Sequence, residues 1–350
     1  MNLGQKAKKT LEEFVPEIDK RIAKYFDEEV KRGFGFSERQ KKVVRQALEH
    51  ACELITRPQK HLRGSFVKYG YALGGGEIGE KIWKAAVAVE MTHGALLMHD
   101  DFMDQDELRR GGPTTHKYYQ QIFDGNSHLA ESMAVSVGDA VLCLGFELLE
   151  SCGSPEATRQ MLRAIANTGH GQAYDVSLEA FKNWTEEDVM ALHRAKTAIY
   201  TYENPLFIGV HLGGIEDSKV IKILRDYAMD GGVAFQLQDD ILGVFGKPEK
   251  TGKSADSDLK QGKCTLLALK AWDRPEVHKV WGKMDASRED LDAAKKAIMD
   301  CGAYEYSKKL AREYAGKAAG TAEKLRRLDL NRDAIDYIQG IAEYMVEREV

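Results

Sequence analysis

The sequence predicts an all-α fold, built as a single large helical bundle over residues 1–350. Apolar residues recur at helical spacing over long stretches, alternating β patterns are scarce, and only 7 prolines occur in 350 residues. Proline disrupts helix interiors, so a chain with few prolines can form long helices. We therefore expect roughly ten or more helices and almost no sheet.

The clearest helical pattern lies in residues 81–104, 128–152, 218–242 and 332–349. In each segment apolar residues return every three or four positions, which places them on one face of a helix. Breaks rich in glycine or charge separate the helices at residues 70–80, 109–115, 151–157 and 243–258. None of these breaks resembles a long flexible linker, so we expect one all-helical domain.

Composition excludes several classes of protein. The chain is 43% hydrophobic and 30% charged with a net charge of −5, which indicates a globular protein without the basic field of a nucleic-acid binder. Its 5 cysteines form no CxxC pair, which favours reduced thiols and a cytoplasmic location. We find no signal peptide and no apolar run of the roughly 18 residues that a membrane span needs.

A first cluster of carboxylates follows the apolar segment 81–104. Asp100 and Asp104 are one helical turn apart on the same face, and Asp101 lies beside them. Mg²⁺ prefers oxygen ligands and often shares one or two carboxylates with substrate phosphates, so three clustered aspartates suit a metal–diphosphate site. A solvated helix end is the alternative, although the helix dipole disfavours carboxylates there.

A second cluster repeats this arrangement 139 positions later. Asp239 and Asp240 end another apolar helical segment, and Gln236 lies one turn before Asp239 on the same face. Lys253 and Lys263 follow in a glycine-containing loop, just as Arg109 and Arg110 follow the first cluster. Two predicted helices that each end in an Asp-Asp pair followed by basic residues form a far more specific signal of a functional site than either helix alone.

These motifs resemble those of the trans-isoprenyl diphosphate synthases, the polyprenyl synthetase family, over about residues 50–270. The matching segments are PQKHLRG at 58–64, DDFMD at 100–104, RRGGPTTH at 109–116, GQAYD at 171–175, KTAIY at 196–200 and QDDILG at 238–243. The resemblance implies the isoprenoid synthase fold, a helical bundle with a central cavity. It also implies a homodimer that joins isopentenyl diphosphate to an allylic diphosphate.

The resemblance assigns roles to individual residues. About three Mg²⁺ ions would be held by Asp100, Asp101, Asp104 and Asp239, with Asp240 supporting the last. The allylic diphosphate would be gripped by Arg109, Lys196 and Lys253. Isopentenyl diphosphate would be bound by Lys60, Arg63, His93 and Arg110. The dipoles of Thr197 and Gln236 would stabilise the allylic cation, and diphosphate itself would accept the proton. Lys263 is assigned to substrate binding, with a helix-capping role as its alternative.

Other polar residues near the motifs are expected to be structural. His99 has no counterpart among the family's ligands, and Asp106 and Glu107 belong to the loop. For Gly138, Asp139 and Gln172, helix packing and support of the site are both open as roles. Asp175 is expected to support the site.

The sequence departs from the commonest family form at three positions. Gly243 stands where a third aspartate is common, His61 replaces an arginine and Gly64 replaces a proline. These departures put the binding of isopentenyl diphosphate in question. They also keep open a non-catalytic subunit of a heteromeric synthase.

The length of the product depends on residues beside the first cluster. Small residues at 85, 88, 92 and 95 share one helix face and leave roughly 16 Å, or three turns, without bulk. Close helix packing is the alternative reading of this stripe. We expect a product of about C20 to C30, with chain length set by Met91, Thr92, Ala95, Leu96 and, from a facing helix, Phe146.

Two further enzyme classes are less consistent with the sequence. Class I terpene cyclases also use a DDxxD motif, but their second metal motif is an Asn/Ser/Glu triad rather than QDDILG. A phosphohydrolase using His99 and Asp100 would leave the second cluster unexplained. Chain elongation accounts for both clusters.

Overall fold

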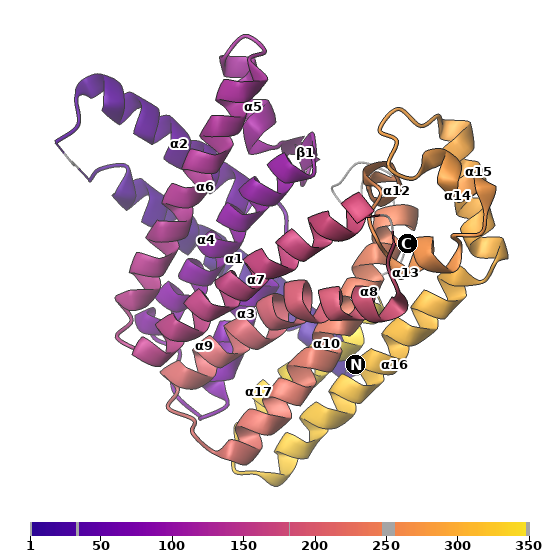
Figure 1. The fold of residues 1–350 in the computed structure, drawn as a ribbon. Helices are drawn as coiled ribbons and strands as arrows, with labels where there is room; N and C mark the ends of the chain where they lie inside the picture. Colours follow the sequence, from indigo (N-terminus) through magenta and orange to yellow (C-terminus); the bar gives the residue numbers. More distant parts are fainter. Residues whose placement is uncertain (1, 33–34, 182, 247–255, 348–350) are drawn as a thin grey trace.

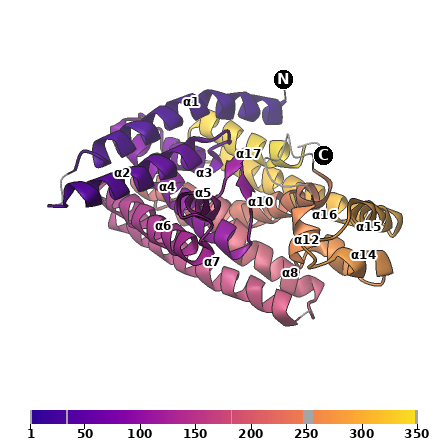
Figure 2. The same ribbon diagram turned by 90° about the horizontal axis from the view of Figure 1, so that it is seen from above.

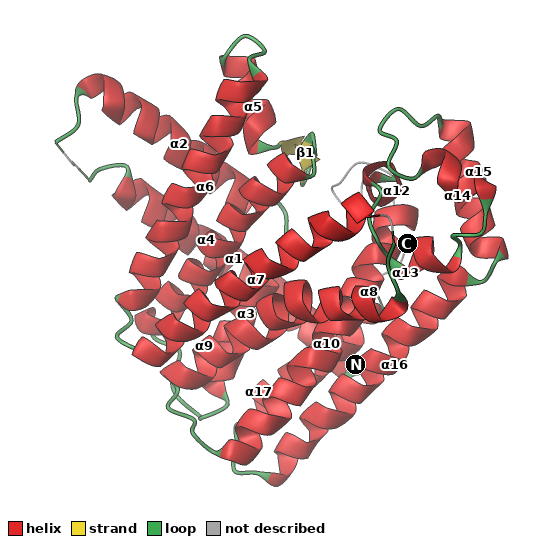
Figure 3. Ribbon diagram, in the orientation of Figure 1, coloured by secondary structure: helices red, strands yellow, loops and turns green. Residues whose placement is uncertain are grey.

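The computed structural model describes residues 2–32, 35–181, 183–246 and 256–347, and helices make up most of them (Figure 3). The only strands in these ranges are β1 (Leu108–Arg109) and β2 (Gly112–Pro113), which pair antiparallel. The prediction of an all-α protein with almost no sheet is therefore confirmed.

The helices follow one another with short connections (Figure 1). The first half of the chain forms α1 (Leu3–Glu29), α2 (Glu38–Thr56), α3 (Leu62–Ala72), α4 (Glu80–Met103), α5 (Thr115–Ile122), α6 (Ser127–Glu150) and α7 (Pro155–Phe181). The middle forms α8 (Glu186–Leu192), the π-helix η1 (His193–Glu203), α9 (Asn204–Leu212) and α10 (Ser218–Phe245). The remainder forms α12 (Ser257–Gln261), α13 (Leu266–Lys270), α14 (Pro275–Val280), α15 (Arg288–Asp300), α16 (Ala303–Glu323), the 3₁₀ helix η2 (Lys324–Arg327) and α17 (Arg332–Val346).

Helix α4 lies inside the bundle because it is apolar on nearly every side. It packs against α1, α2, α3, α6 and α9, and Figure 2 shows it enclosed among the early helices. Helices that are apolar all round need partners on all sides. Its C-terminal end is the exception, because there the chain turns polar at Asp100. The burial of the rest of α4 thus fixes where the first carboxylate cluster emerges.

The small-residue face of α4 packs closely against α6. A Cβ atom on Gly145 of α6 would lie 2.6 Å from Thr92 Oγ1 and 3.0 Å from the Ala88 carbonyl oxygen. The glycine therefore lets the two helix backbones approach each other. At Ala88 and Thr92 the structure shows the close packing that the sequence left as the alternative to a channel wall. The chain-length roles themselves stay predictions.

Helix α6 is the one described helix that is long and apolar enough to cross a membrane by length and composition. Glu131 and Asp139 interrupt the apolar residues of α6, so the expectation of no membrane span stays a prediction. In the fold α6 packs against α4, α5 and α7. Core helices of soluble proteins meet the same criterion, so α6 is weak evidence for a membrane span.

A second group of helices carries the other carboxylate cluster. Helix α10 packs against η1 and α16, and α17 packs against α1 and α16. In Figure 1 the β1–β2 hairpin after α4 and helix α12 lie at the same, upper end of the molecule. The hairpin that follows the first Asp-Asp pair and helix α12, which comes after the second pair in the chain, thus lie on one side of the bundle (Figure 1).

Candidate active site

The first carboxylate cluster lies in the last turn of α4, and its three members differ in their surroundings. The Asp101 side chain is fully buried, whereas those of Asp100 and Asp104 are 25% and 12% exposed. Burial raises the pKa of Asp101 and that of Asp104, against the opposing effect of their cationic partners. Asp100 and Asp104 are therefore the open members of the cluster, while Asp101 is enclosed and keeps one oxygen, Oδ2, without a hydrogen-bond partner among the described residues.

The β1–β2 hairpin presents two arginines in opposite ways. Its central residues Arg110 and Gly111 both have positive φ, at 51° and 82°, which is the backbone of a tight I′ turn. Arg109 donates to Asp101 Oδ1 from Nε at 2.7 Å and also pairs with Asp106. Arg110 has no carboxylate at ion-pair distance within the described ranges. Burial and the charge of Arg109 lower the pKa of Arg110 to about 9. This cation is therefore placed to receive an anion.

Two lysines from later segments reach the first cluster. Lys196 of η1 lies 3.6 Å from Asp100 Oδ1 and 2.9 Å from Asp175 Oδ2 of α7. Lys263, which follows α12, lies 2.5 Å from Asp104 Oδ2. Burial lowers the pKa of both lysines. The nearby carboxylates together have a larger, opposite effect, so the pKa of each lysine is raised. The structure thus brings three distant segments together, whereas the roles that the resemblance gave their residues stay predictions.

Thr197 and Gln236, to which the resemblance assigned the stabilisation of the allylic cation, are in contact in the structure. Thr197 Oγ1 donates to Gln236 Oε1 at 2.5 Å, and Gln236 Nε2 donates to Asp240 Oδ1 at 2.8 Å. Both Thr197 and Lys196 lie in the π-helix η1, a conformation that is rare and frequent at functional sites. Gly232 permits this contact, because a Cβ there would lie 2.2 Å from Ala198 Cα.

The second carboxylate cluster separates by role. Asp240 is buried, and His193 Nε2 lies 3.0 Å from its second carboxylate oxygen, Oδ2. Asp239 is half-buried and has no ion pair with another described residue. Asp239 is thus the member of this pair that could bind a ligand, and Asp240 holds Gln236 and His193 in place. His193 was not predicted, and only its position one turn before Thr197 could have suggested it.

The position of Gly243 is filled from another helix. A Cβ atom on Gly243 would lie 2.0 Å from Asp258 Oδ2, so the Asp258 carboxylate lies where a side chain at 243 would begin. A third aspartate at 243 would require the Asp258 carboxylate to move. The sequence could not have revealed this replacement, because Asp258 follows 15 positions later and reaches Gly243 only through the fold.

The residues predicted to bind isopentenyl diphosphate converge on α3 and α4. Arg63 Nη1 lies 3.0 Å from His93 Nε2, and Arg63 Nη2 donates to Thr201 Oγ1 at 2.6 Å. Burial, with Arg63 and Arg110 nearby, lowers the pKa of His93 well below its usual value, so the ring is neutral. Its Nε2 accepts from Arg63, which puts the proton on Nδ1. Arg63 Nε and His93 Nδ1 are both buried without a hydrogen-bond partner.

Lys60 lies beside the C-terminal helix rather than at the centre of the site. Its Nζ is 4.8 Å from the ring centroid of Tyr344 in α17. The same helix reaches α3 through Tyr337, whose hydroxyl lies 2.6 Å from Ser65 Oγ. The C-terminal helix therefore supports the segment that carries Lys60 and Arg63, which sequence reasoning did not foresee.

The donor set fits a magnesium–diphosphate group. Asp101 Oδ2 is a buried oxygen without a hydrogen-bond partner, and Asp100, Asp104 and Asp239 offer further carboxylate oxygens. Among the described residues no three acidic, histidine or cysteine side chains gather closely enough to hold a metal ion alone. Mg²⁺ usually completes its octahedral shell with water and substrate phosphate, so this spacing agrees with a site that needs substrate.

The remaining predicted residues lie as follows. Lys253 is outside the described residues. His99 Nε2 lies 3.3 Å from the Val135 carbonyl oxygen and fits against Gly138, where a Cβ would clash with the ring. Asp106 is buried against Arg109 and Gln261, and Glu107 is exposed beside Lys117. Among the chain-length candidates Met91, Thr92 and Ala95 are fully buried, whereas Leu96 and Phe146 are partly buried.

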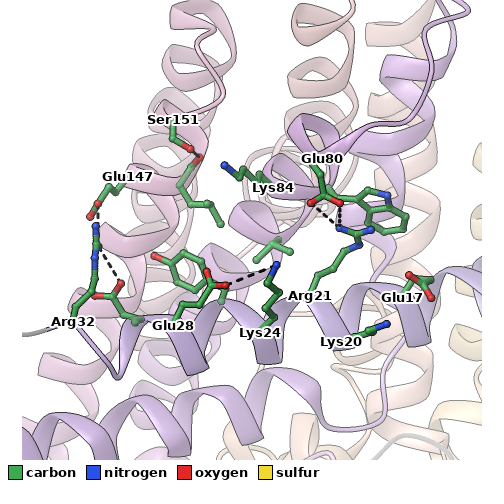
Figure 4. Close-up of a pocket in the computed structure, with 15 residues that line it drawn as sticks. Glu17, Lys20, Arg21, Lys24, Glu28, Arg32, Glu80, Lys84, Glu147 and Ser151 are labelled. Carbon is green, nitrogen blue, oxygen red and sulfur yellow. Dashed lines mark hydrogen bonds and ion pairs between the residues drawn. The ribbon is translucent and has the colours of Figure 1, made fainter.

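A separate groove of about 770 Å³ lies between α1, α4 and α6 (Figure 4). It touches the first turns of α4 at Trp83, roughly 26 Å from Asp100 along the helix. Its charged side chains pair with each other, as Arg21 does with Glu80 at 2.8 Å. This groove is therefore distinct from the carboxylate site.

Comparison with known proteins agrees with this geometry. The polyprenyl synthetase family model matches residues 42–301. The chain belongs to the polyprenyl synthetase family. It is 32% identical over 279 residues to a geranylgeranyl pyrophosphate synthase of Geoglobus acetivorans, covering 78% of this chain and 82% of that protein. It is also 32% identical over 287 residues to a geranylfarnesyl diphosphate synthase of Aeropyrum pernix, covering 79% and 86%.

Solved structures show the same fold. The geranylgeranyl pyrophosphate synthase of Corynebacterium glutamicum, complexed with isoprenyl diphosphate and magnesium, superimposes with a TM-score of 0.86. The two chains are 27% identical, and the match covers 97% of this chain and 99% of that one. The isoprenoid synthase fold of this polyprenyl synthetase is thus shown. Its family is that of chain-elongating synthases, which removes the terpene cyclase and phosphohydrolase alternatives.

Proposed function

We propose that this protein is a Mg²⁺-dependent trans-prenyltransferase that condenses isopentenyl diphosphate with an allylic diphosphate to a product of C20 or longer. The observation that carries the proposal is the meeting of Asp100 and Asp104 with Lys196 and Lys263 at one site. Thr197 links this site through Gln236 to Asp240 of α10, a helix that continues past its Asp-Asp pair to Phe245. Relatives named geranylgeranyl and geranylfarnesyl diphosphate synthases support the product class. They also argue against a non-catalytic subunit.

The reaction breaks the allylic C–O bond, and its electron pair leaves with diphosphate. The double bond of isopentenyl diphosphate attacks the allylic cation, and a proton is then lost to the diphosphate. Mg²⁺, about three ions when bound, supplies positive charge to the departing diphosphate. Preorganised positive charge is the main source of catalysis in such a step, and Lys196 and Lys263 supply part of it from the protein.

Each group of side chains has a distinct task in this proposal. Asp100, Asp104 and Asp239 would hold the metal together with the unpartnered Oδ2 of Asp101, whose other oxygen pairs with Arg109. The dipoles of Thr197 and Gln236 face the allylic cation without a full negative charge that would trap it. Arg63, His93 and Arg110 bind isopentenyl diphosphate, and two of their buried donors, Arg63 Nε and His93 Nδ1, have no hydrogen-bond partner within the described part of the protein.

We further propose a homodimer formed through α5 and α6. Helix α6 is strongly apolar, but only 39% of its apolar window is buried within the chain. Its Leu129 and Val135 are 48% and 41% exposed, and Ile122 of α5 is 40% exposed. Contiguous exposed apolar residues favour a protein interface. A second copy of the same surface would cover them.

The decisive experiment incubates the purified single chain with Mg²⁺, isopentenyl diphosphate and each allylic diphosphate in turn, and sizes the products by mass spectrometry. We expect prenyl diphosphates of C20 or longer. Asp100→Asn should lower turnover by about 100-fold or more. Its matched control, Glu107→Gln, removes an exposed acid and should retain activity. Absence of product from every pair would refute the synthase proposal.

A further inference from the structure

Two departures from the commonest family motif meet on a single carboxylate, that of Glu90 in α4. His61 Nδ1 lies 2.8 Å from Glu90 Oε2, and the Gly64 backbone N–H donates to Glu90 Oε1 at 2.6 Å. The other ring nitrogen, His61 Nε2, lies 2.8 Å from Asp19 Oδ1 of α1. His61 is 2% exposed and Glu90 is 1% exposed, so these contacts replace water almost completely.

The glycine has a role that the more common proline could not fill. Proline has no backbone N–H, so it would leave Glu90 Oε1 without this donor. Space is also tight, because a Cβ on Gly64 would lie 3.2 Å from Glu90 Cγ and 3.3 Å from Phe14 Cζ. A buried carboxylate needs its hydrogen bonds, so the histidine and the glycine satisfy it together. The two departures are therefore linked through Glu90.

This arrangement surrounds two residues of the isopentenyl diphosphate site. His61 and Gly64 flank Arg63 in sequence, and Glu90 precedes His93 by one turn of α4. His61 has a φ of 46°, a left-handed conformation that costs energy in a non-glycine residue. Its two carboxylate partners hold it there at the start of α3. The backbone that aims Arg63 at His93 is thus fixed from both sides.

We propose that Glu90, His61 and Gly64 act as one positioning unit that holds Arg63 and His93 in the geometry needed to bind isopentenyl diphosphate. The inference rests on the proposed function. None of the three touches substrate in this scheme, so they act through their neighbours. The departures at 61 and 64 put the binding of isopentenyl diphosphate in question. In this unit the two departures together supply hydrogen bonds to the Glu90 carboxylate.

The positive charge of His61 contributes to the stability of this unit. The titratable groups that face it are Asp19 from α1 and Glu90 from α4, with cationic Arg63 and neutral His93 nearby. Burial opposes the imidazolium, but Glu90 and Asp19 outweigh burial and raise the pKa of His61 to about 9. The pKa is higher in the folded protein than in the unfolded chain. The stabilisation is therefore complete below about pH 6.5 and is lost as the pH rises through about 9.

The first test replaces Glu90 by Gln and measures the kinetics for each substrate. We expect KM for isopentenyl diphosphate to rise about 10-fold or more, while KM for the allylic diphosphate stays within about twofold. Calorimetry with isopentenyl diphosphate should show the same loss of affinity without turnover. The control, Asp290→Asn, breaks the Lys279–Asp290 pair at 2.6 Å between α14 and α15 and should change neither constant. A lower melting temperature with both KM values unchanged would overturn the proposal.

The second test uses pH. In the wild-type enzyme kcat/KM for isopentenyl diphosphate should fall as the pH rises through about 9, more steeply than kcat/KM for the allylic substrate. His61→Gln cannot titrate, so it should have a higher KM at pH 7.5 and a flatter alkaline limb. An unchanged alkaline limb in His61→Gln would overturn the role of His61. If the wild-type chain makes no product at all, the proposed function fails instead, and calorimetry with Glu90→Gln still tests the positioning unit.

Discussion

Lys263 Nζ lies 2.5 Å from Asp104 Oδ2 and joins two segments that are 159 positions apart in the chain. The ammonium group stands beside Asp104 where the proposed site places a divalent cation. Lys196 has the same relation to Asp100. Without metal, the protein's own cations thus offset the repulsion between the clustered carboxylates.

Lys263→Met should therefore make stability depend more strongly on magnesium. Without Mg²⁺ we expect a loss of about 2–4 kcal/mol in the free energy of unfolding, because the buried carboxylate of Asp104 loses its partner. Binding of Mg²⁺ stabilises the folded state by mass action, so added Mg²⁺ should raise the melting temperature more in this variant than in the wild type. Thermal unfolding with and without Mg²⁺ measures both effects.

A matched control is available on the surface. Lys222→Met breaks an exposed pair with Asp226 at 2.8 Å, which should change stability by less than about 1 kcal/mol and leave the magnesium response unaltered. Equal magnesium shifts in Lys263→Met and the wild type would show that Lys263 does not compete with the metal.

Arg109 and Arg110 should respond differently to the same substitution. Arg109→Gln leaves the buried carboxylate of Asp101 unpaired, and we expect a loss of about 3–5 kcal/mol of stability. Arg110→Gln removes a cation whose pKa burial and Arg109 already lower, so stability should be nearly unchanged or improved. Instead, KM for isopentenyl diphosphate should rise. Denaturant unfolding and steady-state kinetics on both variants separate these effects, and a reversed pattern would contradict the assignment.

Much of this site could be predicted from the sequence because its motifs are local. The spacing of Asp100 and Asp104 on one helix face, and that of Gln236 and Asp239, follows from helix geometry alone. The family resemblance supplied the partners between motifs, such as Lys196 with the first cluster. The all-α fold followed from periodicity, since long apolar helices have few other ways to bury their faces.

The parts that could not be predicted depend on contacts between distant segments. Asp258 fills the place of a side chain at 243, and Glu90 unites His61 with Gly64, but neither contact leaves a pattern in one stretch of sequence. Arg109 and Arg110 are adjacent and chemically alike. The pairing of Arg109 with Asp101 and Asp106 in the structure shows that the first points into the protein.

Restoring the third aspartate should harm the protein. Gly243→Asp should lose about 1–3 kcal/mol of stability without a gain in activity, because its Cβ would lie 2.0 Å from Asp258 Oδ2. The double variant Gly243→Asp/Asp258→Gly removes the clash and should regain most of that loss. Chemical denaturation of the single and double variants tests the coupling. Simple additivity of the two substitutions would argue against direct contact.

The last prediction concerns the length of the product. Phe146 lies on α6, is partly buried and packs against the core cluster that contains Met91 and Ala95. Phe146→Ala removes its ring, so if Phe146 forms the floor of the prenyl channel, the products should lengthen by one or more isoprene units. Phe181→Ala is the matched control, because it removes a ring that is 76% exposed at the end of α7, away from the face between α4 and α6. It should leave the longest product unchanged. Product sizing by mass spectrometry decides the matter, and an unchanged distribution in Phe146→Ala would exclude Phe146 as the floor.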